Sequence, residues 1–150
     1  MISKLSIGTA NFGMKYGIKN NSKIYQKNIK KILDFARLNK IKYIDTAESY
    51  GHVHKILGNI GVRNFKISTK LHLSDNNILN IDKYLNKFIE KTLVDINVNS
   101  IDTLFIHNVS VLDSPLKKNI FLFLNKLKKN KLIKKYGFSI YTKKDFLNLI

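Results

Sequence analysis

Short apolar runs alternate along the whole chain with longer stretches of helical period, and this alternation limits the folds open to it. The runs predict five strands, which cover Lys4–Ile7, Lys42–Ile44, Phe65–Thr69, Ile101–Ile106 and Lys135–Phe138. Between them apolar residues recur at helical spacing, as Ile29, Leu33 and Ala36 do. Each helix must lay its apolar stripe on the sheet that it has just left, so the alternation favours parallel strands joined by right-handed crossovers.

Helix boundaries carry their own signals. Ser114 precedes Pro115 as a predicted N-cap, with the proline at the first helical position. Thr142 and Asp145 have the spacing of a capping box. We expect the shortest crossover helix at Gly51–Gly61 and a fifth helix at Phe146–Ile150. All 150 residues are predicted to form one α/β domain.

Four polar residues, Asp45, Tyr50, Lys70 and His107, lie at or just beyond the carboxyl ends of three successive predicted strands. Side chains at these ends converge on one face of a strand–helix sheet, where such folds keep their chemistry. We therefore expect the four groups to form one proton-transfer site.

The four residue types suit the reduction of a carbonyl group. Hydride addition builds negative charge on the carbonyl oxygen, and Tyr50 could supply the proton. A cation such as Lys70 favours the ionised form of a nearby phenol, and a carboxylate such as Asp45 keeps a partly buried lysine charged. A neutral imidazole at His107 could bind and orient the carbonyl oxygen.

Each residue taken alone also has a structural interpretation. Asp45 could cap a turn, Tyr50 could be a loop aromatic, and Lys70 is one of 25 lysines. His107 points either into a core or into the site. The other histidines, His52, His54 and His72, are predicted to be bystanders. Only the joint placement of the four groups at successive strand ends favours a site.

Five segments, in order, resemble the aldo-keto reductase family. They are Ile7–Gly13 (IGTANFG), Ile44–Gly51 (IDTAESYG) followed by Leu57 and Gly58, Ile67–Lys70 (ISTK), Asp102–Asn108 (DTLFIHN) and Lys135–Ser139 (KYGFS). The resemblance implies that Tyr50 is the acid, that Lys70 and Asp45 tune it, and that His107 positions the carbonyl. It also implies a (β/α)8 barrel that reduces an aldehyde or ketone, including sugar-like carbonyls, with NADPH or NADH.

The resemblance also indicates cofactor contacts. Gly8 and Thr9 would lie near the nicotinamide, and Ser139 would bind its amide. The family has a Ser-Asn pair after the fifth strand, whereas this chain has Ser139 followed by Ile140. In the helix after Tyr50 the family often has a glutamate, and this chain has His54.

A complete barrel of this type takes about 250 residues, so we expect a partial barrel that ends before strands 6–8. The first and fifth strands would then be edges with apolar inner faces exposed. A complementary C-terminal half-barrel chain or self-association could cover them. The resemblance assigns to the missing strands the contacts to the cofactor's phosphates.

The net charge of +17 raises a second function, because clustered cations bind nucleic acid. Only Arg37 and Arg63 among the 27 basic residues are arginines, and lysines decorate every helix, so solvated helix faces explain most of the charge. The alternative to the enzyme is therefore a non-catalytic remnant or a basic RNA-binding module.

The composition gives little support for a disulfide-stabilised, metal-binding, membrane-spanning or secreted protein. The chain has no cysteine, which excludes disulfides and thiolate metal sites and is compatible with the cytoplasm. Its four histidines lack carboxylate neighbours at metal-site spacing, so no metal is expected. No apolar run approaches the roughly 20 residues needed to span a bilayer, and no signal peptide is recognised.

Overall fold

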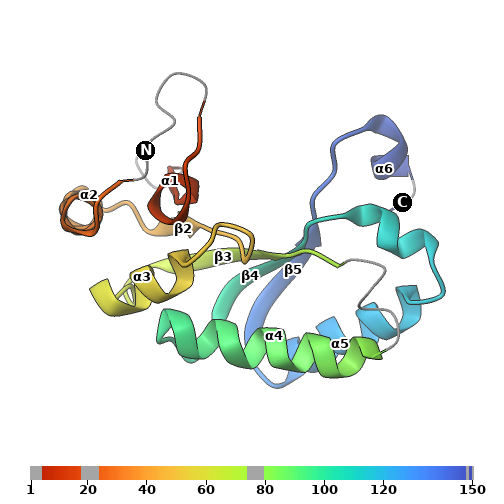
Figure 1. The fold of residues 1–150 in the computed structure, drawn as a ribbon. Helices are drawn as coiled ribbons and strands as arrows, with labels where there is room; N and C mark the ends of the chain where they lie inside the picture. The colour runs from red at the N-terminus through yellow and green to blue at the C-terminus, as the bar shows by residue number, and fades with distance from the viewer. Residues whose placement is uncertain (1–4, 18–23, 74–79, 148, 150) are drawn as a thin grey trace.

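Five parallel strands form one sheet in sequence order (Figure 1). The computed structural model describes residues 5–17, 24–73, 80–147 and 149. The strands are β1 (Ser6–Gly8), β2 (Tyr43–Asp45), β3 (Lys66–Leu71), β4 (Ile101–Ile106) and β5 (Ile133–Phe138). Each strand pairs in parallel with the next, as the alternation predicted.

Four helices connect successive strands. They are α2 (Gln26–Leu38), α3 (Val53–Ile60), α4 (Ile81–Ile96) and α5 (Lys117–Lys129). Three shorter elements follow strand ends: α1 (Ala10–Gly13), the 3-10 helix η3 (Val109–Asp113) and α6 (Lys143–Leu147). Figure 1 shows α4 and α5 running along the same side of the sheet. In the described part of the chain, no helix is both long and apolar enough to cross a membrane.

The strand boundaries differ from the predicted ones in ways that matter for the site. Strand β4 has the predicted bounds, whereas Gly8 and Asp45 belong to the ends of β1 and β2. Strand β3 continues to Leu71 because its pairing with β4 persists at Lys70 and Leu71. Lys70 thus lies inside a strand rather than beyond one. Position 4 of the first predicted strand lies outside the described residues.

The two predicted helix caps can also be compared with the structure. The capping box at α6 is confirmed, because the Asp145 amide donates to Thr142 Oγ1 at 3.1 Å and the Thr142 amide to Asp145 Oδ2 at 2.9 Å. Helix α6 begins at Lys143, earlier than predicted, and positions 148 and 150 lie outside the described residues. Helix α5 begins at Lys117, two residues after Pro115, although the Ser114 hydroxyl accepts a hydrogen bond from the Leu116 amide.

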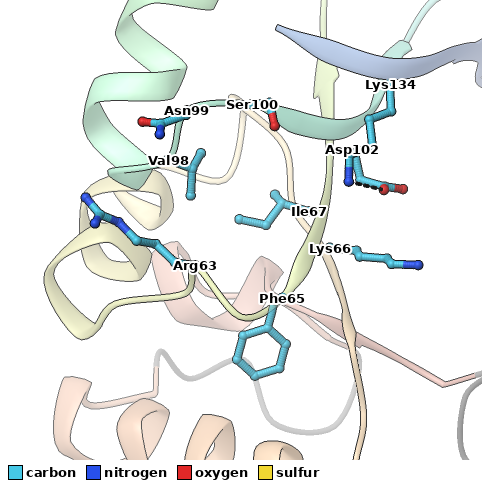
Figure 2. Close-up of a pocket in the computed structure, with 9 residues that line it drawn as sticks. All are labelled: Arg63, Phe65, Lys66, Ile67, Val98, Asn99, Ser100, Asp102 and Lys134. Carbon is cyan, nitrogen blue, oxygen red and sulfur yellow. Dashed lines mark ion pairs between the residues drawn. The ribbon is translucent and has the colours of Figure 1, made fainter. Parts of the chain in front are cut away.

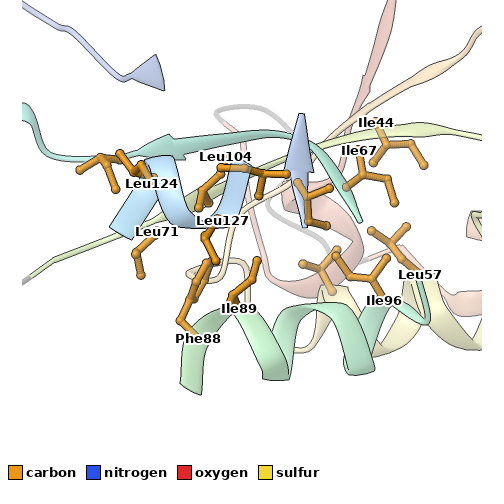
Figure 3. Close-up of a cluster of buried hydrophobic side chains, with 14 of the residues drawn as sticks. Ile44, Leu57, Ile67, Leu71, Phe88, Ile89, Ile96, Leu104, Leu124 and Leu127 are labelled. Carbon is orange, nitrogen blue, oxygen red and sulfur yellow. The ribbon is translucent and has the colours of Figure 1, made fainter. Parts of the chain in front are cut away.

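The core lies between the sheet and its helices (Figure 3). Alternate strand residues such as Ile44, Ile67 and Leu104 face the helices and are fully or almost fully buried. The helices contribute their stripes, including Leu57 of α3 and Ile96 of α4, which are also fully buried. One continuous apolar layer therefore fixes the strands and leaves their other face free.

On the two edge strands that other face carries mainly small and polar residues, so the expected exposure of apolar inner faces on the first and fifth strands is wrong. One register row across the sheet consists of Gly8, Asp45, Ser68, Thr103 and Lys135. On this face β1 carries Ser6 and Gly8, and β5 carries Lys135 and Gly137, while Ile133 at the start of β5 is buried. Side chains alternate along a strand, and most apolar members of the runs face the helices, whereas Ile101, Phe105 and Ile133 lie on the opposite face.

Candidate active site

An ion pair at the carboxyl ends of two neighbouring strands forms the centre of the site. The Lys70 ammonium donates to both carboxylate oxygens of Asp45, each at 2.7 Å, and to the carbonyl of Thr46 at 3.1 Å. Both side chains lie on the face away from the core, because Asp45 pairs with Ser68, two residues before Lys70. Only 16% of the Lys70 side chain is exposed. Three charge-assisted bonds therefore fix the position of a largely shielded cation.

Tyr50 lies in the turn between β2 and α3, and the Lys70 Nζ is 5.5 Å from the centroid of its ring. The ring is half-buried, and the Tyr50 amide donates to the carbonyl of Ala47 at 3.2 Å. A cation at this distance is attracted to the phenol ring. The structure thus brings the predicted acid next to the predicted cation.

The backbone beside Tyr50 packs against α1 through two glycines. A Cβ placed on Gly13 would lie 1.7 Å from the Tyr50 carbonyl oxygen, and one on Gly51 would lie 2.8 Å from the Gly13 carbonyl oxygen. Gly51 also has a φ of +67°, which favours glycine. Sequence reasoning did not single out Gly13, although its place at the end of the IGTANFG segment was a usable signal.

His107 follows β4 directly and completes the group of four. Its amide donates to the carbonyl of Leu71 at 2.8 Å, which places it at the strand end beside Lys70. Burial, together with the charges of Lys70 and His72, lowers the pKa of His107, while Asp45 has a smaller opposing effect. The imidazole is consequently neutral near pH 7 and can donate to or accept from a carbonyl oxygen.

An open pocket of about 290 Å³ extends from His107 across the ends of β4 and β5. The rings of His72 and Tyr141 lie with their centroids 6.0 and 6.2 Å from that of His107. The pocket is lined by His72, His107, Asn108, Val109, Ser110, Tyr141 and Asp145. It has room for a small molecule that contacts the imidazole. His72, predicted to be a bystander, therefore lies on its wall.

The three predicted cofactor residues occupy different environments. Gly8 is exposed at the end of β1, with open space where a Cβ would be. Thr9 is fully buried, and both its hydroxyl and its amide donate to the carbonyl of Asp45, at 3.0 and 3.1 Å. Ser139 is half-buried beyond β5, and its amide donates to the carbonyl of Ile106 at 2.9 Å. Thr9 thus holds Asp45, while Gly8 and Ser139 leave surface for a ligand.

A separate pocket of about 260 Å³ lies at the opposite, amino ends of β3, β4 and β5 (Figure 2). Its walls include Arg63, Lys66 and the ion pair of Lys134 with Asp102, whose charged atoms are 3.7 Å apart. The Arg63 guanidinium donates to the carbonyl and side chain of Asn97. None of the four predicted residues lines this pocket.

Comparison with known proteins gives one family and one fold. Residues 4–147 match the family model described as "Aldo/keto reductase family". No curated protein sequence matches the chain significantly.

Solved structures match over most of this chain. The Pseudomonas aeruginosa protein PA4992, assigned to the aldo-keto reductases, is 26% identical with a TM-score of 0.73, and the match covers 89% of this chain and 54% of that one. An aldo/keto reductase from Klebsiella pneumoniae, in complex with NADP and acetate, is 18% identical with a TM-score of 0.70, and the match covers 96% and 48%. The chain therefore spans about half the length of these relatives.

Proposed function

Since this chain belongs to the aldo/keto reductase family, we propose that it reduces an aldehyde or ketone to an alcohol with a nicotinamide cofactor. The observation that carries the proposal is the position of Lys70, bonded to Asp45 on one side and next to the Tyr50 ring on the other. A phenol beside a fixed ammonium is a suitable proton donor, because the cation stabilises the phenolate that remains.

The four residues have distinct roles in this proposal. The neutral imidazole of His107 binds the carbonyl oxygen of the substrate and orients it. Tyr50 donates its proton to that oxygen as negative charge develops. Asp45 holds Lys70 in place through two hydrogen bonds, and Lys70 stabilises the phenolate of Tyr50. Reduced nicotinamide, when bound, supplies the hydride.

The nicotinamide end of a cofactor fits the exposed surface at the carboxyl ends of β1 and β5. Ser139 provides a hydroxyl at the end of β5, and the space above Gly8 lets a flat ring approach the sheet closely. Relatives from Klebsiella pneumoniae are solved with NADP and with NADPH. We propose NADPH, with NADH as the alternative, and the net charge of +17 should attract either anion.

We further propose that activity requires more polypeptide than these 150 residues. The chain spans about half the length of the matched structures, and both β1 and β5 have one unpaired edge in the described sheet. A complementary chain with further strand–helix units, or a second copy of this chain, could supply the remaining wall. We also propose a cytoplasmic location, with which the absence of cysteine is compatible.

Replacement of Tyr50 by Phe tests the proposal. The assay follows NADPH oxidation with a panel of small aldehydes, ketones and sugar-like carbonyls, with a complementary half-barrel chain supplied. Y50F should abolish turnover because the proton donor is lost, while NADPH affinity, measured by fluorescence quenching, should stay within about twofold of the original value. The control is Y136F, which loses a phenol hydroxyl that bonds Asn125 at 3.1 Å, away from the site.

Unchanged turnover in Y50F would refute the role of Tyr50. A folded original protein without turnover on the whole panel would refute the enzyme. In that case the alternative is a non-catalytic module, and RNA binding with a steep salt dependence would identify the basic version of it. Both arginines already bind protein groups, Arg37 at Asp34 and the Gly61 carbonyl and Arg63 at Asn97, which disfavours base recognition.

A further inference from the structure

His54 forms a buried hydrogen bond between the element that follows Tyr50 and the strand that carries Lys70. It lies in the first turn of α3, four residues after Tyr50, and is only 5% exposed. Its Nε2 is 3.1 Å from Oγ1 of Thr69, which is fully buried in β3 and directly precedes Lys70. The bond thus crosses from helix to strand one residue away from the site's cation.

The imidazole of His54 takes no part in proton transfer at neutral pH. Burial lowers the pKa of His54 to about 4, and the charge of Lys91 acts in the same direction, while Asp95 opposes it. The side chain is therefore a neutral polar link. Thr69 points to the core face of β3, whereas Lys70 points to the opposite face, so His54 cannot reach a substrate beside Lys70.

Contacts between Tyr50 and Lys70 do not fix their spacing by themselves. The ammonium lies 5.5 Å from the ring centroid, which is an electrostatic contact with broad geometry. The apolar residues of α3 that face the sheet, Val53 and Leu57, are fully buried, but their contacts are non-directional. The backbone bond from the Glu48 amide to the Lys70 carbonyl, at 3.2 Å, ties the start of the turn to β3. The His54–Thr69 bond is a second directional contact, which ties α3, after Tyr50, to the same strand.

We propose that the His54–Thr69 hydrogen bond is a positioning device, which holds the Tyr50 turn at the correct distance from Lys70. His54 acts through Thr69 and the backbone and touches no reacting group. The kinetic consequence rests on the proposed reductase function, whereas the structural consequence does not. A misplacement of about 1 Å can cost roughly a hundredfold in rate, so a small displacement should be measurable.

Three substitutions and one control test whether the His54–Thr69 hydrogen bond is needed. Thr69→Val removes the hydroxyl and keeps the shape, and His54→Asn removes the polar atom at the Nε2 position. His54→Gln places an amide nitrogen close to the original Nε2. Y136F is the matched control, because it removes an exposed hydrogen bond between α5 and β5 on the helix side of the sheet.

For the full chain supplied with a complementary half-barrel chain, we expect kcat to fall roughly ten- to hundredfold in T69V and H54N. The KM for the carbonyl and the Kd for NADPH should change by less than about twofold, because binding groups are untouched. H54Q should recover most of the rate, and Y136F should keep it. Equal loss in H54Q and H54N would show that only the imidazole's volume matters and would overturn the proposal.

A second readout needs no turnover. The seven tyrosines can be labelled with 3-fluorotyrosine, and Y50F identifies the Tyr50 signal by ¹⁹F NMR. T69V and H54N should shift this signal, while H54Q and Y136F should leave it in place. If the signal moves as expected but no carbonyl is reduced, the reductase proposal fails and the positioning proposal stands. An unmoved signal in both T69V and H54N overturns the positioning proposal.

Discussion

A single ammonium group, that of Lys70, has neighbours of three chemical kinds. It bonds the Asp45 carboxylate, lies near the Tyr50 phenol, and helps to keep the His107 imidazole neutral by lowering its pKa. Because these effects share one charge, removal of Lys70 would disturb all three groups at once. Residue-level chemistry in this site is therefore cooperative rather than additive.

The sequence predicted these four residues because their types and strand-end positions carry chemical meaning. It did not predict His54 or Gly13, whose importance comes from packing. His54 shares a helical face with Leu57, so the helical period was a signal that it is buried. The partner Thr69 and the close approach of Gly13 to Tyr50 depend on how separate elements dock, which local patterns do not encode.

Burial of a neutral His54 predicts a stability loss in mild acid. The pKa of His54 is lowered from 6.5 to about 4 on folding, so the unfolded chain binds more protons between these values. Stability from this residue is complete above pH 6.5 and is lost as pH falls towards 4, by about 3 kcal/mol in total. Urea unfolding of the original protein and H54Q should show this difference, with H54Q depending less on pH.

The comparison of the two proteins isolates His54 from other titrating groups. The pKa of Glu48 is raised, mainly by burial, which makes that residue favour folding as pH falls and so act in the opposite direction. Glu48 is present in both proteins, and its effect cancels in the difference. Parallel stability curves for the original protein and H54Q between pH 4 and 6.5 would contradict a buried, neutral His54.

At the scale of elements, long periodic segments were predictable and short ones were not. Strand β4 and the helical stripes of α2, α4 and α5 follow directly from apolar spacing. Helix α1 has only four residues, too few to show a period, yet it contacts the Tyr50 turn. The end of β3 was missed because a charged Lys70 interrupts the apolar run, while pairing with β4 keeps the backbone extended.

Helices α3 and α4 approach each other at Gly58, where no side chain fits. A Cβ at this position would lie 2.1 Å from the carbonyl oxygen of Asp95. Glycine in a helix normally costs about 0.5–1 kcal/mol relative to alanine, so G58A would stabilise an uncrowded helix. Here we expect G58A to destabilise by about 1–3 kcal/mol, because the two helices must separate.

Chemical denaturation shows directly whether G58A stabilises or destabilises the protein. The control N59A changes an exposed neighbour in the same helix and should leave stability within about 0.5 kcal/mol. A higher unfolding midpoint for G58A than for the original protein would show that α3 and α4 pack less closely than the structure indicates.

For the whole molecule, exposed apolar side chains lie near the two lateral edges of the sheet, beside β1 and beyond β5, and also on α4 and α5, where Val94 and Leu122 are exposed. Phe35 and Leu38 of α2, near the β1 end, are 66% and 82% exposed. Beyond β5, Tyr141 and Phe146 are 73% and 50% exposed. Further strand–helix units docked at these two edges would bury the side chains beside β1 and beyond β5.

Charge repulsion and apolar contacts between copies of the chain oppose each other, so we expect their association to depend on salt. The net charge of +17 repels a second copy at low ionic strength, and salt screens this repulsion without weakening apolar contacts. Sedimentation equilibrium should find monomers in dilute buffer and a rising mass as sodium chloride is added. Replacing Phe35 and Leu38 with serine should suppress that rise, whereas a mass that falls with salt would indicate association through charge instead.

Lys70 is much less exposed to solvent than the lysines on the surface. Amine-reactive reagents need an accessible amine, whereas the Lys70 ammonium is bonded to Asp45 and only 16% of its side chain is exposed. Lys30, Lys91 and Lys134 are between 57% and 64% exposed even within their ion pairs. The protein could therefore be attached to a solid support or tagged with a dye through its surface lysines while Lys70 stays unmodified.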